Sequence, residues 1–299
     1  MRWPGPCAIF KTMHLPSCSP SSAASPVKRL RVSAALLALA WLPALAQPDE
    51  VPFITSPDNV TLEMLQIAGV GAKDHVIDLG SGDGRIVIVA AKRFGASGEG
   101  VEIVPDLVAR SQASARDAGV ADRVTFHQKD LFTMDLGAAT VVTMYLLPEF
   151  NLKLRPTLLA LKPGTRIVSH DWDMGDWQPD RTVVVPVPNK QVGMEKSSKV
   201  HFWVVPAQIQ GLWCGAGLLN GATLKLVQRF QSFDGTLVHR KRTRELSGRI
   251  DGSLLTTASK RGDLTLEVKD GEMRLASAEG VLALARGSSF KRAAGSSCP

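Results

Sequence analysis

The chain has 299 residues, of which 44% are hydrophobic and 21% charged, and its formal net charge is +7. This composition excludes a disordered or collagen-like chain, and the length suffices for one large domain and a smaller one. The positive charge is unevenly spread: residues 47–207 carry 16 Lys and Arg against 20 Asp and Glu, whereas residues 208–299 carry 14 against 8. The overall charge therefore gives no reason to expect a nucleic-acid partner.

Residues 1–46 have the features of a leader. They contain basic but no acidic residues, and an apolar run over residues 32–45 ends in Ala44-Leu45-Ala46, a small-x-small cleavage pattern. The run is shorter than the roughly 20 residues that a membrane span needs. We therefore expect a signal peptide, a periplasmic location and no transmembrane span in the mature chain. A cytoplasmic location follows if the leader is not functional.

Residues 47–207 alternate short apolar strands with helical stretches, which is typical of a mostly parallel sheet covered by helices on both faces. We expect strands at 75–79, 98–103, 124–127, 140–145 and 165–170, and helices at 57–68, 83–93, 105–119 and 149–161. Two last strands, 182–187 and 200–205, have no strong helix between them and are expected to form an antiparallel edge hairpin. The predicted fold is α/β, a doubly wound Rossmann-like sheet.

Residues 208–299 are expected to form a small antiparallel all-β domain, either a meander or a compact barrel. Alternating runs are separated by Asp234-Gly235, Asp251-Gly252 and Asp270-Gly271, and Asp-Gly is a strong signal for a hairpin turn. The basic run at residues 239–244 fits a solvated strand face better than a contact with an anionic surface.

Two cysteines, Cys214 and Cys298, remain after the predicted cleavage site. In an oxidising compartment they can form a disulfide across nearly the whole tail domain. The alternative is a pair of free thiols.

A glycine-rich turn follows the first predicted strand, in the sequence Asp78-Leu-Gly80-Ser81-Gly82-Asp-Gly84. Glycines allow a sharp turn and a close approach of ligand to backbone, and the turn opens onto a helix N-terminus. A dinucleotide site needs a further glycine where this chain has Arg85. The acidic Asp78 before the glycines suits a cationic ligand instead.

Two further acids are expected at the same edge of the sheet. Glu102 ends the second strand, and Asp130, followed by Leu131, comes after the third. Ligands of open α/β sheets bind at the carboxyl ends of the strands. Asp78, Glu102 and Asp130 are therefore expected to converge on one ligand.

These blocks resemble the class I methyltransferases, which bind S-adenosylmethionine. The segment 51–57, the block Asp78–Ile88 (DLGSGDGRIVI) and the block Thr143–Pro148 (TMYLLP) are similar to the protein-lysine methyltransferases of the ATP synthase c subunit and the ADP/ATP carrier. The likeness covers about residues 51–180. It implies that Asp78 holds the methionine ammonium, Glu102 the ribose and Asp130 the adenine. The cofactor-binding residues that it implies are Pro52, Phe53, Thr55, Asp78, Gly80, Ser81, Gly82, Gly84, Glu102, Asp130 and Leu131.

The resemblance also implies that Tyr145 lies beside the transferred methyl group, and we assign Tyr145 and Asp171 as catalytic. An acceptor wall is expected from Glu149, His170, Trp172 and Trp177, where aromatic faces attract an ammonium group. Simple packing is the alternative for both tryptophans. No metal site is expected, because His170-Asp171 has no third ligand at suitable spacing.

Three functions remain open at this point. The first is an enzyme that methylates a protein lysine. The second is an exported cofactor-binding module or scaffold without turnover, which the predicted export favours because S-adenosylmethionine is made in the cytosol. The third is a methyltransferase for a small molecule.

Overall fold

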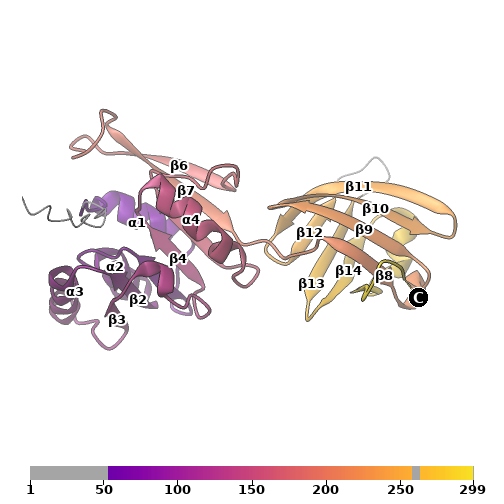
Figure 1. Cartoon of the computed structure of the whole chain (residues 1–299), viewed down its shortest axis with the longest axis horizontal. Coiled ribbons are helices and arrows are strands. Elements are labelled where there is room, and N and C mark those ends of the chain that lie inside the picture. Colours follow the sequence, from indigo (N-terminus) through magenta and orange to yellow (C-terminus); the bar gives the residue numbers. More distant parts are fainter. Residues whose placement is uncertain (1–52, 258–262, 299) are drawn as a thin grey trace, which may run out of the picture. The chain divides into compact units, whose positions relative to one another are not determined.

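The computed structural model describes residues 53–257 and 263–298, so the predicted leader and Pro52 lie outside the described residues. The first domain holds a seven-stranded sheet in the order β3-β2-β1-β4-β5-β7-β6 (Figure 1). Its strands are β1 (His75–Leu79), β2 (Ser97–Glu102), β3 (Val124–Gln128), β4 (Val141–Met144), β5 (Arg166–His170), β6 (Arg181–Pro186) and β7 (Ser197–Val204). β1 to β5 are parallel, whereas β7 runs antiparallel to β5 and to β6. The predicted fold class and the antiparallel edge hairpin are both confirmed.

Helices cover both faces of this sheet. They are α1 (Asp58–Ile67), α2 (Arg85–Phe94), α3 (Pro105–Asp117) and α4 (Pro148–Leu159), and a short 3-10 turn, η1 (Leu131–Thr133), joins β3 to β4. One core cluster joins α1 and α2 to the face that carries Val76 and Val141. The opposite face carries Ile77 and Val142 and packs against α4. The alternation of neighbouring strand residues between the two clusters is the period-two signature of a sheet buried on both faces.

Three helix starts differ from the prediction, of which α4 begins one residue early, at Pro148. Pro57 is the N-cap of α1 rather than its first residue, and Ser56 contributes no capping bond among the described residues. α2 begins at Arg85 instead of Asp83, because Gly84 has a left-handed backbone (φ +78°) that a right-handed helix cannot contain.

The second domain is a closed barrel with the strand order β10-β11-β12-β13-β14-β15-β8-β9. Its strands are β8 (Gly211–Gly215), β9 (Thr223–Arg229), β10 (Ser232–His239), β11 (Arg242–Asp251), β12 (Leu254–Thr257), β13 (Leu264–Lys269), β14 (Glu272–Ala278) and β15 (Ser289–Arg292), with 3-10 turns η2 (Gly217–Leu219) and η3 (Gly280–Ala285). Closure removes the sheet edges that invite aggregation. Apolar side chains, among them Leu224, Leu255 and Phe290, fill the interior.

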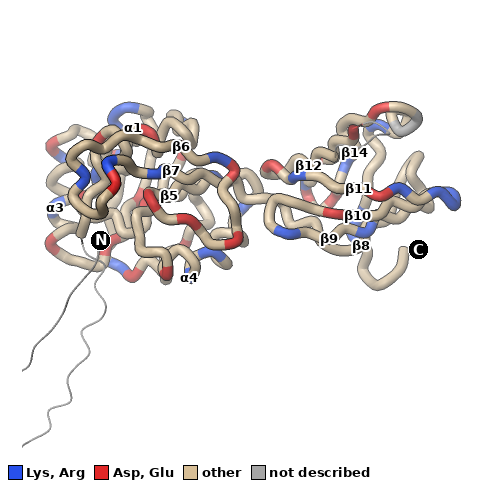
Figure 2. Tube along the Cα trace, turned by 90° about the horizontal axis from the view of Figure 1, so that it is seen from above, with Lys and Arg blue, Asp and Glu red and all other residues tan. Residues whose placement is uncertain are grey.

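One predicted turn of the barrel is wrong, and the turns that follow β9 and β10 were not predicted. Asp234-Gly235 lies inside β10, and Gly235 is needed there because a Cβ would come within 2.5 Å of Leu226 Cδ2. The turn between β10 and β11 is formed by Arg240 and Lys241, both with positive φ (48° and 65°). A concentration of Lys and Arg is visible at this end of β10 and β11 in Figure 2.

A disulfide joins Cys214 of β8 to Cys298, 84 residues further on, with the Cα atoms 5.5 Å apart. The closure of such a long loop restricts the unfolded chain. We expect Cys298→Ser to lower the free energy of unfolding by about 2–5 kcal/mol. Calorimetry with and without reductant measures this, and reductant should destabilise the wild type but not the variant. Equal stability of the two oxidised proteins would contradict the expectation.

Candidate active site

The glycine turn after β1 has the backbone that its sequence requires. Gly80, Gly82 and Gly84 all have positive φ (72°, 53° and 78°), which L-residues with a Cβ rarely adopt. The ring of Phe53 lies against this turn, since a Cβ on Gly82 would come within 2.5 Å of Phe53 Cε2. The turn is thus narrow and has an aromatic ring against it, and the role of Phe53 in cofactor binding stays a prediction.

Gly82→Ala tests whether this close approach matters for binding. The substitution adds backbone strain and displaces Phe53, so we expect an affinity for S-adenosylmethionine about tenfold weaker. Gly69→Ala is a matched control, because Gly69 also has positive φ (+59°) but a Cβ added there would meet nothing within 4 Å. Titration calorimetry compares the two variants. Equal affinities in both would show that the approach of Phe53 is irrelevant.

Asp78 is a buried carboxyl group at the end of β1. Only 2% of the residue is exposed, and Thr143 Oγ1 of β4 donates a hydrogen bond to Asp78 Oδ1 at 2.7 Å. Burial, together with the nearby carboxylates of Asp83 and Glu102, raises the pKa of Asp78 to about 7. A cationic ligand group beside Asp78 would favour the ionised form of this carboxyl and would in turn be stabilised by its negative charge.

Glu102 is fixed at the tip of β2 by three backbone N–H groups. Gly82 N donates to Oε2 at 3.0 Å, and Ile103 N and Val104 N donate to Oε1 at 2.8 and 3.0 Å. The glycine turn and Glu102 are therefore held together as one unit. Because Glu102 is bonded to the turn that directly follows Asp78, these two predicted residues share one neighbourhood.

Asp130 lies at the same edge of the sheet but is exposed. Its Oδ1 accepts from Phe132 N at 2.9 Å as the N-cap of η1, which begins with the partly buried Leu131. Asp130 comes two residues after Gln128, and Gln128 is the residue of β3 that pairs with Glu102 of β2. No direct contact joins Asp130 to Asp78 or Glu102 among the contacts described for this chain.

These residues fit the group that the resemblance implies. The buried carboxyl of Asp78 offers Oδ2 to a cation, the glycines leave the backbone accessible, and Ser81 Oγ is buried without a hydrogen-bond partner in the described part of the chain. A buried polar atom without a partner is uncommon, and a bound ligand is one way to supply the missing partner.

A cavity of about 320 Å³ lies beyond the ends of β4 and β5. Its lining includes Thr55 from the segment before α1, Tyr145 after β4, His170 at the end of β5, and residues of the segment that joins β6 to β7. The Tyr145 ring is stacked on the His170 ring at a centroid distance of 3.9 Å. Because the segment 53–57 contacts the glycine turn at Phe53 and lines this cavity at Thr55, it connects the two places.

His170 is a neutral part of the cavity wall. Ser56 Oγ and His170 Nδ1 are 2.8 Å apart, and burial lowers the pKa of His170 to about 4. Its Nε2 has no hydrogen-bond partner among the described residues and lies 3.5 Å from Asp171 Oδ2. An uncharged imidazole stacked on a phenol can accommodate an ammonium group without repelling it.

Asp171 directly follows β5 with a left-handed backbone (φ +62°). Strained backbone of this kind is concentrated at functional sites. Lys199 N donates to Asp171 Oδ1 at 2.9 Å, and Lys190 Nζ lies 2.8 Å from Oδ2. Burial, together with the negative charge of Asp171, raises the pKa of Tyr145, so the phenol stays protonated at neutral pH.

The predicted acceptor wall is only partly assembled. Glu149 is exposed in the first turn of α4. Trp172 is 43% exposed, and neither residue lines the cavity. Trp177 is fully buried in the core beside Trp203, so its assignment to the substrate wall is wrong and simple packing explains it.

Four residues near the site were not foreseen as part of it. Asn151 is buried in α4 and donates to the backbone carbonyls of Trp172 and Asp173, which fixes the segment after Asp171. Arg85 donates to Ser56 O at 2.9 Å and pairs with Asp83, which ties the segment 53–57 to the glycine turn. The other two residues are Ser56, which is bonded to His170, and Lys190, which pairs with Asp171. Apart from the Arg85–Asp83 pair, these contacts join distant segments, and the local sequence pattern gives no signal for them.

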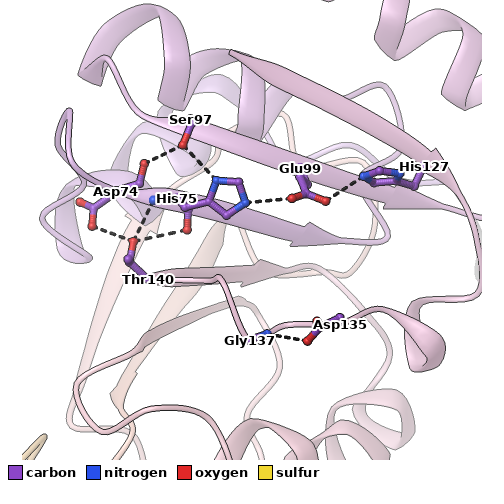
Figure 3. Close-up of polar contacts among 8 residues, drawn as sticks. All are labelled: Asp74, His75, Ser97, Glu99, His127, Asp135, Gly137 and Thr140. Carbon is purple, nitrogen blue, oxygen red and sulfur yellow. Dashed lines mark hydrogen bonds and ion pairs between the residues drawn. The ribbon is translucent and has the colours of Figure 1, made fainter. Parts of the chain in front are cut away.

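A separate polar cluster crosses three neighbouring strands (Figure 3). Glu99 of β2 lies between His75 of β1 and His127 of β3, at 3.0 and 2.8 Å from their Nε2 atoms. Thr140 Oγ1 accepts from His75 N and donates to Asp74 Oδ1, which joins the start of β1 to the residue before β4. Across residues 53–257 and 263–298, no three His, Cys, Asp or Glu side chains are grouped as metal ligands.

Comparison with known proteins identifies the family. Residues 78–181 match the model of the ANTKMT methyltransferase domain. A protein-lysine N-methyltransferase from Saccharolobus islandicus is 42% identical over 137 residues, which cover 45% of this chain and 85% of that protein. The chain belongs to the protein-lysine N-methyltransferase family. It is an S-adenosylmethionine-dependent enzyme, and the predicted cofactor is thereby confirmed.

More distant relatives share less of their length with this methyltransferase. The adenine nucleotide translocase lysine N-methyltransferase of mouse is 33% identical over 131 residues, 44% of this chain and 57% of that protein. A solved structure described as an RNA methyltransferase from Salinibacter ruber, in complex with S-adenosyl-L-homocysteine, is 51% identical, with a TM-score of 0.47, covering 52% of this chain and 96% of that one.

Proposed function

We propose that the enzyme transfers a methyl group from S-adenosylmethionine to the ε-amine of a lysine in a protein. The observation that carries this proposal is the aromatic wall of the cavity, where Tyr145 and His170 are stacked, with Asp171 Oδ2 behind it at 3.5 Å from His170 Nε2. The cavity meets, through the segment 53–57, the turn that fits the cofactor. The names of the relatives in mouse and Saccharolobus islandicus support the same acceptor class.

The cofactor supplies an electrophilic methyl group on a sulfonium. The residues of this chain have to place an amine in line with it and remove the amine's proton. At pH 7 deprotonation of a lysine costs about 5 kcal/mol from its reference pKa of ~10.4. Desolvation against the Tyr145–His170 wall lowers that cost, and we assign to Asp171 the role of orienting the amine or accepting its proton.

The site of action is part of the same proposal. The basic and apolar pattern of residues 28–46 favours export, and the Cys214–Cys298 disulfide is of a kind that persists in oxidising compartments. We therefore propose that the enzyme acts on proteins outside the cytosol. None of the helices within residues 53–257 and 263–298 is long and apolar enough to cross a membrane.

A transfer experiment tests the acceptor class. The full chain is incubated with methyl-labelled S-adenosylmethionine and, in separate reactions, with envelope proteins, RNA and a small-molecule extract. We expect label on protein lysines, identified after hydrolysis as methyl-lysine. Label found only in RNA or only in small molecules would overturn the proposed acceptor while leaving the methyltransferase assignment intact.

A further inference from the structure

We propose that Lys190, a lysine of the chain itself, occupies the acceptor subsite and competes with the incoming lysine. This inference rests on the proposed function. Lys190 belongs to the segment between β6 and β7, and it lines the cavity together with Tyr145 and His170. Its Nζ is 2.8 Å from Asp171 Oδ2 and also donates to Ser197 O at 2.8 Å, and its side chain is only 14% exposed.

The chemistry around Lys190 Nζ is the chemistry expected for an acceptor amine. Asp171 Oδ1 is already engaged by Lys199 N, so Oδ2 is the oxygen that can pair with an ammonium group. The same Oδ2 lies 3.5 Å from Nε2 of the neutral His170, which has no hydrogen-bond partner in the part of the chain that the structure describes. Two ammonium groups at one carboxylate oxygen repel each other, so the binding of a second ammonium group is disfavoured while Lys190 is in place. An acceptor lysine that is to meet Asp171 must therefore displace Lys190.

The segment that carries Lys190 presents exposed side chains to a partner. Its backbone is tied at the base by the hydrogen bond from Val187 N to Lys196 O, whereas Val192 and Met194 are 50% and 98% exposed. Val192 also lines the cavity, and exposed apolar side chains of this kind can contact the surface of a protein acceptor. Such contacts offset the cost of displacing Lys190, whereas a free small amine makes none of them. The competition by Lys190 therefore favours protein acceptors over small amines.

Lys190→Met tests the competition, with poly-L-lysine as the acceptor probe. Removal of the internal ammonium should lower the apparent KM for poly-L-lysine about three- to tenfold, with unchanged affinity for S-adenosylmethionine. Lys190→Arg keeps the charge and should behave as the wild type. Lys196→Met removes one charge from the same segment at an exposed position and should not change KM.

Either direction of the result is decisive. An unchanged or raised KM in Lys190→Met would overturn the proposal and leave Lys190 as a structural partner of Asp171. If no variant transfers label to lysine, the proposed function has failed, and binding of butylammonium, followed by NMR, decides this inference separately. Tighter butylammonium binding by Lys190→Met than by Lys196→Met supports the competition, and equal binding contradicts it.

Discussion

Asp78→Asn should reduce the affinity for S-adenosylmethionine at least a hundredfold while leaving the fold intact. The side chain is isosteric, and Thr143 Oγ1 can still donate to its oxygen. What is lost is a buried negative charge opposite a cationic ligand group, and loss of one partner of such a pair costs about 3–5 kcal/mol. Titration calorimetry measures the affinity, and Asp106→Asn, an exposed acid in the first turn of α3, is the control for a loss of charge.

The affinity should also depend on pH through the same residue. Because the pKa of Asp78 is raised to about 7, the carboxyl is protonated below that pH and must lose its proton when a cation binds. Affinity should thus weaken as the pH falls below 7, approaching tenfold per pH unit. Thr143→Val removes a hydrogen bond that lowers this pKa, so the onset should move to higher pH. A flat profile from pH 5 to 8 would contradict this account of Asp78.

The stability of the ligand-free protein should depend on pH in the opposite direction: it should decrease as the pH rises. The unfolded chain ionises Asp78 near 3.8, whereas the folded chain keeps the proton until about 7, so the folded state binds more protons between these values. Stability contributed by the protonated group is complete below pH 3.8 and decreases as the pH rises through this window, by up to roughly 4 kcal/mol. Asp78→Asn should lack this decrease, which denaturant unfolding at a series of pH values measures.

The glycine turn and Glu102 could be located from the sequence because their positions are set locally. A strand, a turn with three glycines and a helix follow one another within 20 residues, and the period-two and helical patterns fix which ends of the strands meet. The parallel order of β1, β2 and β4 then brings Asp78, Glu102 and Thr143 to one edge. For this part of the site, the strand pattern is sufficient.

The acceptor end could not be assembled in the same way, because its contacts join distant segments. Ser56 meets His170 across 114 residues, and nothing in either local pattern indicates the pair. Trp177 is close in sequence to the site but is fully buried, because residue type alone does not distinguish a core position from a cavity wall. The Arg240-Lys241 turn was missed because its positive φ values fall on residues that seldom adopt them.

Asp171→Asn should remove turnover while sparing cofactor binding, and it is the sharpest test of the acceptor end. Asparagine tolerates the left-handed backbone at this position, so the variant avoids the strain that Asp171→Ala adds. It keeps an oxygen for Lys199 N but lacks the charge that orients an amine and takes up its proton. General-base contributions of this kind are worth about 10²- to 10⁴-fold in kcat. Single-turnover methyl transfer measures the chemical step, and calorimetry the cofactor affinity.

The control for this variant lies two residues away. Asp173→Asn changes an exposed acid whose Oδ1 accepts only from Gly175 N among its described contacts, so turnover should remain. The combination of Asp171→Asn with Lys190→Met separates two roles of the carboxylate. If Asp171 acts on the acceptor amine, the double variant stays inactive, because removing Lys190 opens the subsite without restoring a base. If Asp171 serves only to neutralise Lys190, loss of both charges restores turnover, and the catalytic assignment of Asp171 falls.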